Sequence, residues 1–385
     1  MGLAPPAAAE DMRSRQWYLE AMQAEKMWRV SKGEGVKVAV LDTGVRETSS
    51  LRGQVLPGKD VSTLPGEASD DYDGHGTTMA ELIAGTGEGG GLKGLAPGAE
   101  IIPIRTYLMD YKHPDAPKEG NLHKAIRAAA DSDAKIINMS VGGFIADGYL
   151  DDAVKYAASK GKLMFAATGN SGDKKNQVEY PAAYPEVAGV ASVDRSAEVV
   201  KTSTSGRHVT LSSPGDDIPG WCDENFASYC RSGGTSSATA IASASAALIW
   251  SEHPDWTANQ VLRVMIETAG RADKKAHGRS DFIGYGTVRP SRVLLKGEGN
   301  PGPAGGSPLV EGDSEPSTAP SPSPSTRKED GENGEPGEKN TAEKTDAADA
   351  TDSGDDSNLL PIVGTGAGVA VLVVGAFAYL RLRRR

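Results

Sequence analysis

The stretch Val36-Lys37-Val38-Ala39-Val40-Leu41-Asp42-Thr43-Gly44 is an apolar, β-branched run that ends in an acid and a glycine. Runs that are apolar on both faces are typical of strands covered on both sides. Similar runs recur along the chain, and amphipathic stretches at 121–131 and 148–160 lie between them. The further runs are 101–104, 135–139, 163–167 and 187–193. This alternation predicts an α/β fold with a mainly parallel central sheet covered by helices.

Composition limits the classes of function. The 385 residues carry a formal net charge of -11, with 38% hydrophobic and 24% charged residues. An acidic chain repels nucleic acid, so we expect no nucleic-acid partner. No His/Cys cluster has the spacing of a zinc site, and we predict no cofactor and no metal ligand.

Five regions follow from composition. Residues 1–12 read as a signal-peptide remnant or as a flexible N-terminus, because Ala7-Ala8-Ala9 fits a cleavage site but the basic start is missing. Residues 13–297 hold the globular pattern. Residues 298–358 are rich in Pro, Gly, Ser and acids, which predicts a disordered linker.

The remaining two regions predict a membrane anchor. Residues 359–380 contain no charged side chain, and about 20 such residues span a bilayer core. The arginines in 381–385 should stay cytoplasmic. We therefore expect a single-pass protein of the cell membrane, with residues 13–297 outside the cell.

Three residues have the chemistry of an acyl-transfer site. Asp42 ends the first strong strand, where functional groups of α/β sheets gather. His75 stands between Gly74 and Gly76, just before a helix-like run. Ser236 follows Gly233-Gly234-Thr235 and opens a long Ala/Ser-rich run, where a helix N-terminus favours a developing anion. Taken singly, Asp42 and Ser236 could also be ordinary caps.

Asn170 lies just after the strand at 163–167, in Thr168-Gly169-Asn170-Ser171-Gly172. Its amide could donate a hydrogen bond to an oxyanion, or it could form an Asx turn. The order Asp, His, Ser is the order found in subtilisin. A lipase-like α/β hydrolase is a disfavoured alternative, since it needs Gly-x-Ser-x-Gly and the order Ser, Asp, His.

Over about residues 17–295 the sequence resembles the subtilisin-like serine proteases. The shared motifs are Asp42-Thr43-Gly44, His75-Gly76-Thr77, Asn138-Met139-Ser140, Gly169-Asn170 and Gly234-Thr235-Ser236. The resemblance implies a three-layer fold and a serine endopeptidase with Asp42, His75 and Ser236 as triad and Asn170 in the oxyanion hole. Ala240 departs from the family, which usually has proline there. Family members often bind calcium structurally, and no acidic loop here is compelling enough to name.

The resemblance also implies a substrate-binding surface. Polypeptide substrate would lie along Ser140-Val141-Gly142, with Ala167-Thr168-Gly169 as the wall of the primary pocket. Glu179 immediately precedes Tyr180-Pro181, the position at the bottom of that pocket. A carboxylate there would prefer a basic substrate residue; alternatively, Glu179 points into solvent.

A narrower resemblance is to the mycosins, membrane-anchored subtilases of type VII secretion. It rests on Tyr180-Pro181-Ala182-Ala183-Tyr184-Pro185, the proline-rich linker and the final span ending in arginines. It implies membrane components of a secretion system as partners, and secretion substrates as targets. The alternative is a scaffold of that complex in which catalysis is dispensable.

Cys222 and Cys230 are the two cysteines of the chain. Their closeness favours a local disulfide, which needs an oxidising compartment. The alternative is two reduced, unrelated thiols.

Overall fold

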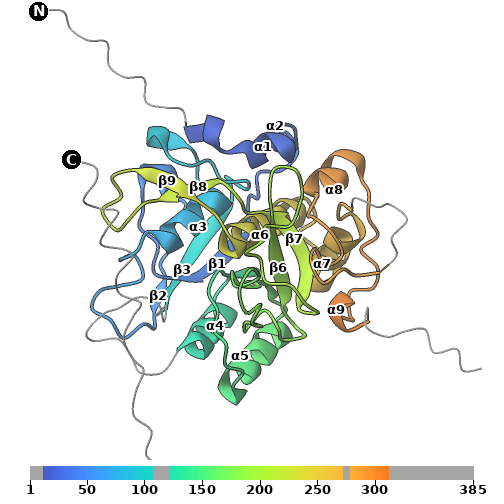
Figure 1. Ribbon diagram of the computed structural model, residues 1–385. Helices are drawn as coiled ribbons and strands as arrows, with labels where there is room; N and C mark the ends of the chain where they lie inside the picture. The colour runs from blue at the N-terminus through green and yellow to red at the C-terminus, as the bar shows by residue number, and fades with distance from the viewer. Residues whose placement is uncertain (1–11, 107–120, 272–277, 312–385) are drawn as a thin grey trace, which may run out of the picture. The chain divides into compact units, whose positions relative to one another are not determined.

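A computed structural model describes residues 12–106, 121–271 and 278–311. Seven parallel strands form one sheet in the order β2-β3-β1-β4-β5-β6-β7 (Figure 1). The strands are β1 (Lys37–Asp42), β2 (Lys59–Asp60), β3 (Glu100–Arg105), β4 (Ile136–Met139), β5 (Leu163–Ala167), β6 (Ala188–Val193) and β7 (Val209–Pro214). The predicted parallel α/β architecture is confirmed.

The register places the carboxyl ends of three neighbouring strands together. Leu41 of β1 pairs with Met139 of β4, and Met139 pairs with Ala166 of β5. The residues that follow these strands therefore meet at one edge of the sheet, as expected for parallel strands.

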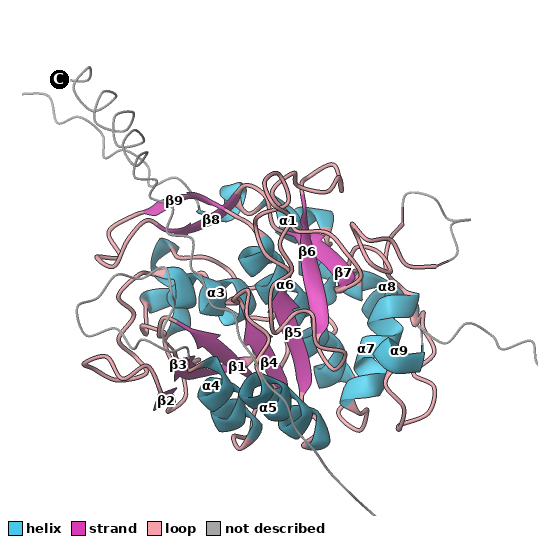
Figure 2. Cartoon of the chain, turned by 60° about the horizontal axis from the view of Figure 1, so that its bottom comes forward, coloured by secondary structure: helices cyan, strands magenta, loops and turns pink. Residues whose placement is uncertain are grey.

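Helices cover both faces of the sheet, as Figure 2 shows. Val38 and Val40 of β1 face a core shared with α3 (His75–Ala84) and α6 (Thr235–Glu252). Ala39 and Leu41 face a second core shared with α4 (Leu122–Ala130) and α5 (Gly148–Ser159). Both faces of β1 are apolar for this reason, and the result is a three-layer α/β/α arrangement.

Helix α6 is buried almost all round, with 15 of its 18 residues inside the protein. Ala and Ser dominate its sequence, so the helix can lie close to the sheet and still satisfy its hydroxyls. Ser245, for example, donates to the carbonyl of Ile241 over 2.8 Å. This packing fixes the start of α6, where Ser236 lies.

The remaining elements surround this frame. An antiparallel hairpin, β8 (Ile218–Trp221) and β9 (Tyr229–Ser232), leads directly into α6. The short helices are η1 (Met12–Arg15), α1 (Trp17–Ala21), α2 (Ala24–Met27), η2 (Ser49–Leu51), η3 (Glu88–Gly90), α7 (Ala258–Glu267), α8 (Pro290–Lys296) and α9 (Pro308–Glu311).

The first described part of the predicted linker, 298–311, is bound to α7. Arg263 of α7 donates to the carbonyls of Pro301 and Pro303 over 2.8 and 3.0 Å. Within the described ranges no helix is long and apolar enough to cross a membrane. The predicted span at 359–380, the rest of the linker and residues 1–11 lie outside those ranges.

Candidate active site

Asp42 ends β1 and is fully buried. Its Oδ1 accepts a hydrogen bond from the backbone N–H of Thr43 over 2.8 Å. The same oxygen lies 2.7 Å from Nδ1 of His75. A buried carboxylate held in this way fixes the orientation of the imidazole.

His75 is the first residue of α3, and small neighbours let it approach Asp42. Gly74 before it has a φ of 88°. A Cβ on Gly76 would come within 2.1 Å of the carbonyl oxygen of Gly44 and 3.0 Å of the Asp42 Cβ. Glycine at position 76 is therefore required for α3 to start against the end of β1.

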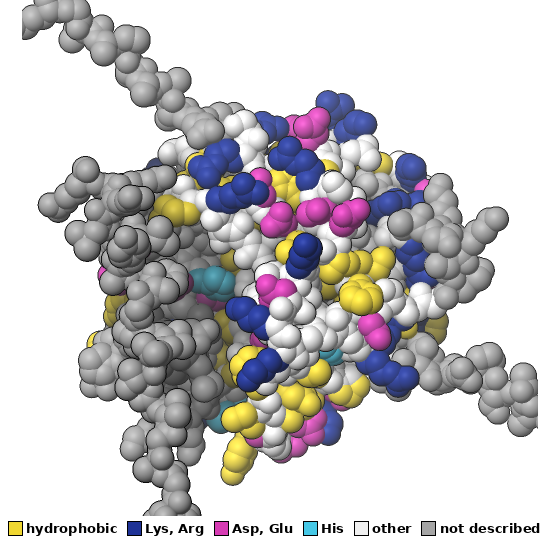
Figure 3. All heavy atoms as spheres, in the orientation of Figure 1, with side chains coloured by type: hydrophobic (Ala, Val, Ile, Leu, Met, Phe, Trp, Pro, Cys, Tyr) yellow, Lys and Arg dark blue, Asp and Glu magenta, His cyan; other side chains and the backbone are white. Residues whose placement is uncertain are grey.

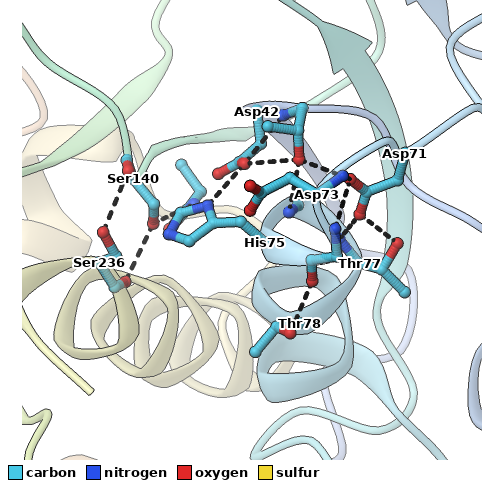
Figure 4. Close-up of polar contacts among 12 residues, drawn as sticks. Asp42, Asp71, Asp73, His75, Thr77, Thr78, Ser140 and Ser236 are labelled. Atoms are coloured by element: carbon cyan, nitrogen blue, oxygen red, sulfur yellow. Dashed lines mark hydrogen bonds and ion pairs between the residues drawn. The ribbon is translucent and has the colours of Figure 1, made fainter. Parts of the chain in front are cut away.

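Acidic neighbours control the charge of His75. Burial alone would lower the pKa of His75, but the Asp42 carboxylate, with smaller contributions from Asp73 and Asp71, raises it to about 9. The imidazole side chain of His75 remains 28% exposed, so it is open to a substrate. Figure 4 shows it between Asp42 and Ser236.

Ser236 is the second residue of α6. Gly234 immediately before the helix has a φ of 124°, and a Cβ there would lie 2.9 Å from the Asn170 amide oxygen. The Ser236 hydroxyl donates to the carbonyl oxygen of Ser140 over 3.1 Å, as Figure 4 shows. Among the described residues no hydrogen bond joins the Ser236 hydroxyl to His75.

Asn170 lies beside the start of α6. Its Oδ1 accepts from the backbone N–H and the hydroxyl of Thr235, over 3.0 and 3.2 Å. These bonds fix the side chain through its oxygen. The Nδ2 group is thus the donor that Asn170 can offer a ligand next to Ser236.

A polar chain positions the residues after β4. Ser243 of α6 donates to Oδ1 of Asn138, and Asn138 donates to Oγ of Ser140, both over 3.0 Å. Ser140 in turn donates to the carbonyl of Ser236 over 3.0 Å. The predicted substrate strand is thereby tied to the first turn of α6.

Glu179 lies between the predicted pocket wall and the predicted substrate-binding segment. A Cβ on Gly169 would lie 2.2 Å from its Oε1, and a Cβ on Gly142 would lie 3.1 Å from its Oε2. Reciprocal backbone hydrogen bonds between Gly143 and Tyr180, of 2.9 and 2.8 Å, hold the two segments together. The structure thus brings the Glu179 carboxylate next to Gly169 on one side and Gly142 on the other. The same two segments contain the other predicted binding residues, which are Ala167, Thr168, Ser140 and Val141.

Asp71 was missed by the sequence reasoning. This buried carboxylate accepts five hydrogen bonds: from the Thr43 hydroxyl, the N–H groups of Asp73 and Gly74, and both donors of Thr77. It ties the segment after β1 to the first turn of α3 (Figure 4). The sequence did offer one signal for Asp71: it lies three residues before Gly74, at the start of the glycine-flanked histidine motif.

Cys222 and Cys230 form a disulfide across the β8–β9 hairpin, as predicted. The hairpin contacts α3: the N–H of Trp221 donates to the Thr78 hydroxyl over 3.0 Å, and the Tyr229 hydroxyl donates to the buried Glu81 over 2.8 Å. It therefore connects the helix that carries His75 to the segment that leads into Ser236.

No group of three or more His, Cys, Asp or Glu side chains able to hold a metal ion occurs in the described part of the chain. This observation does not test the prediction of no metal ligand, nor the question of structural calcium that the sequence left open.

The model of the subtilase family matches residues 33–286. The chain belongs to the subtilase family. The predicted family is confirmed.

Curated relatives include the minor extracellular protease Epr of Bacillus subtilis, 32% identical over 71% of this chain and 41% of Epr. The major intracellular serine protease of the same organism is 35% identical over 52% of this chain and 64% of its own length. The chain thus spans about half the length of these two relatives. Subtilisin BL of Lederbergia lenta is 31% identical over 72% of this chain and 97% of its own length.

Among solved structures, MycP1 from Mycobacterium smegmatis has a TM-score of 0.66 and 25% identity, covering 78% of this chain and 89% of its own. MycP3, a protease from the type VII (ESX-3) secretion system, has a TM-score of 0.61 and 29% identity, covering 76% of this chain and 89% of its own. These likenesses support the narrower resemblance to the mycosins.

Proposed function

We propose that this subtilase hydrolyses peptide bonds with Ser236 as nucleophile, His75 as general base and acid, and Asp42 as the group that orients His75. The observation that carries the proposal is the 2.7 Å contact between Asp42 Oδ1 and His75 Nδ1, with the ring between Asp42 and Ser236. Serine is a weak nucleophile without a base. A peptide in the site would displace the Ser236 hydroxyl from the Ser140 carbonyl toward His75.

The reaction proceeds in two acyl-transfer steps. His75 takes the Ser236 proton as Oγ attacks the carbonyl carbon, and it returns that proton to the leaving amine. Asp42 stabilises the imidazolium. The Asn170 Nδ2 and the backbone N–H of Ser236 donate to the oxyanion, and the 18-residue helix α6 adds its N-terminal dipole. Water then hydrolyses the acyl-enzyme by the same route.

The substrate class follows from Glu179. Its carboxylate lies between Gly142 and Gly169, where a side chain of the substrate residue before the scissile bond would enter. A partly desolvated carboxylate there favours Lys or Arg through a charge-assisted hydrogen bond. Peptide libraries should show this preference for wild type and lose it for Glu179→Gln. If the cleavage profile of Glu179→Gln is the same as that of wild type, Glu179 does not determine the specificity of the pocket.

The cellular location and the partners are proposed from the predicted anchor at 359–380 and from the similarity to the MycP1 and MycP3 structures. In this view the enzyme sits outside the cell on a single membrane span and processes substrates of a type VII secretion system. Membrane components of that system would be its partners. If secretion is restored as well by Ser236→Ala as by wild type, the chain acts there as a scaffold instead.

The activity is tested by labelling the full chain with a fluorophosphonate. Wild type should be labelled, and Ser236→Ala should not. Ser237→Ala is the matched control, because Ser237 is the adjacent residue of α6 and is buried. Labelling that survives in Ser236→Ala would refute the assignment of the nucleophile.

A further inference from the structure

A cavity of about 360 Å³ lies beside the start of β7, and none of the proposed catalytic residues lines it. Its polar lining comes from Arg207, His208 and Arg279. Apolar side chains form most of the remaining wall, and they are Val178, Ala182, Tyr184, Val187, Tyr285 and Leu309. A mainly apolar hollow with a few converging polar groups is the usual form of a binding site.

Positive charge dominates the polar lining of this cavity. Arg207 is exposed, and its side chain has no ion pair or hydrogen bond within the described part of the chain. Arg279 donates through Nη1 to the carbonyl of Val209 over 2.9 Å, and its Nη2 lies 3.3 Å from Oδ1 of Asp281. Asp281 thus balances one of the two guanidinium charges, and the other is available to a carboxylate.

The described part of the linker ends at this cavity. Arg263 holds the linker on α7 by donating to the carbonyls of Pro301 and Gly306, over 2.8 and 3.0 Å. Helix α9 then brings Leu309 into the cavity wall. On the surface around α9, basic and hydrophobic side chains lie side by side (Figure 3). The residues that continue the chain therefore start at the edge of the cavity.

The residues that continue the chain are acidic. Glu311, Asp313 and Glu315 fall within five residues. Asp313 and Glu315 are four and six residues beyond Leu309, which is about 13–20 Å of extended chain. Because Arg207 and Leu309 line the same cavity, that length suffices to bring either carboxylate to the guanidinium. So short a tether keeps the local concentration of the carboxylates near the millimolar range, and one weak ion pair is then enough to hold the segment.

We propose that segment 312–315 docks in this cavity and that the carboxylates of Asp313 and Glu315 pair with Arg207 and Arg279. The inference goes beyond the proposed catalysis and does not depend on it. Docking extends the part of the linker that is held on the catalytic domain from 311 to 315. The tether then leaves the domain next to the segment that contains the proposed specificity residue.

The test measures cleavage of the linker in the full-length protein by an added protease that cuts on the amino side of aspartate. Every variant also carries Ser236→Ala, so that self-cleavage does not interfere. Docking should protect the bond before Asp313, and the bond before Asp330 is the control within the same molecule. Arg207→Gln should raise the rate of cleavage before Asp313 by about 3- to 10-fold, in the range of a partly exposed ion pair. The rate before Asp330 should stay unchanged.

A matched control and a second measurement accompany this test. Arg52→Gln removes another exposed arginine, which does not line the cavity, and it should leave both rates as they were. The pKa of His208 reports on the cavity from inside. Burial and the positive charge of Arg279 lower that pKa, and a docked carboxylate raises it. NMR titration should therefore find a lower pKa for His208 in Asp313→Asn/Glu315→Gln than in the parent protein.

Three outcomes would overturn the inference. If the bond before Asp313 is cut equally fast with and without Arg207, the segment does not dock there. If Arg52→Gln has the same effect as Arg207→Gln, the protection reflects the net charge of the domain and not the cavity. If millimolar inorganic phosphate raises the pKa of His208 in the double variant to that of the parent protein, the cavity binds anions in general and is no seat for the linker.

Discussion

The hydroxyl of Thr43 donates to Oδ1 of Asp71 over 2.7 Å and also accepts the N–H of Gly76 over 2.9 Å. One side chain after β1 is thus bonded to the loop before α3 and to the helix itself. Because Asp42 precedes Thr43 and His75 precedes Gly76, these two bonds help to set the distance between the two proposed catalytic groups. Asp71 is therefore a positioning residue.

Asp71→Ala should lower both stability and turnover. It leaves buried donors of Thr43, Gly74 and Thr77 without their acceptor, which costs about 1–3 kcal/mol. A shift of His75 should reduce kcat by about 10- to 100-fold with a smaller change in KM. Urea unfolding and steady-state kinetics measure the two effects. The same effects in Asp70→Ala would show that the loop, not Asp71, matters.

Activity should rise with pH until His75 is neutral. The general base must be unprotonated, and the pKa of His75 is raised to about 9, so kcat/KM should increase through neutral pH and level off above about 9. NMR titration of the imidazole in Ser236→Ala should give the same pKa. A plateau reached by pH 7 would contradict the electrostatic role of Asp42, Asp73 and Asp71.

Glu81 should make the fold less stable as pH rises from about 4.5 to 7. Burial raises the pKa of Glu81 to about 7, against bonds from Thr48 and Tyr229 that lower it. The folded state thus keeps a proton that the unfolded chain releases, and stability falls with pH in this window. Glu81→Gln should flatten the pH dependence of the free energy of unfolding. An unchanged slope would mean that Glu81 is ionised in the fold.

The sequence predicted the sheet, and it pointed to Asp42, His75 and Ser236 as candidates, because the signals for both are local. Apolar runs mark covered strands, and glycines beside His75 and Ser236 mark tight backbone contacts. Asp71 and the Ser243–Asn138–Ser140 chain were not predicted, because they depend on which residues meet across separate elements. The ordered start of the linker was missed for the same reason: Arg263 supplies hydrogen bonds that composition does not show.

The disulfide should support activity as well as stability. Cys222 and Cys230 are 8 residues apart, and closing so short a loop contributes about 2–3 kcal/mol in the loop-entropy model. The double variant Cys222→Ser/Cys230→Ser should unfold at lower urea and should lose activity, because the hairpin braces α3 through Trp221 and Tyr229. Alkylation and mass spectrometry should find no free thiol in wild type. Two free thiols would rule out the bond in the mature protein.

Protease added to intact protoplasts should release a soluble, active domain. The cut should fall within 312–358, because residues 298–311 are held on α7 by the bonds from Arg263 and Gln260, whereas the later residues are polar, acidic and proline-rich. The charge-free stretch at 359–380 followed by arginines predicts that 381–385 is the cytoplasmic end. Western blots with antibodies against each end would follow the two fragments, the short one staying with the membrane.

Replacing Arg381, Arg383, Arg384 and Arg385 by Gln tests the charge rule separately, since it should weaken the orientation without changing the released domain. Full protection of 312–358 in intact protoplasts, with cleavage only after lysis, would place the active site inside the cell and refute this topology.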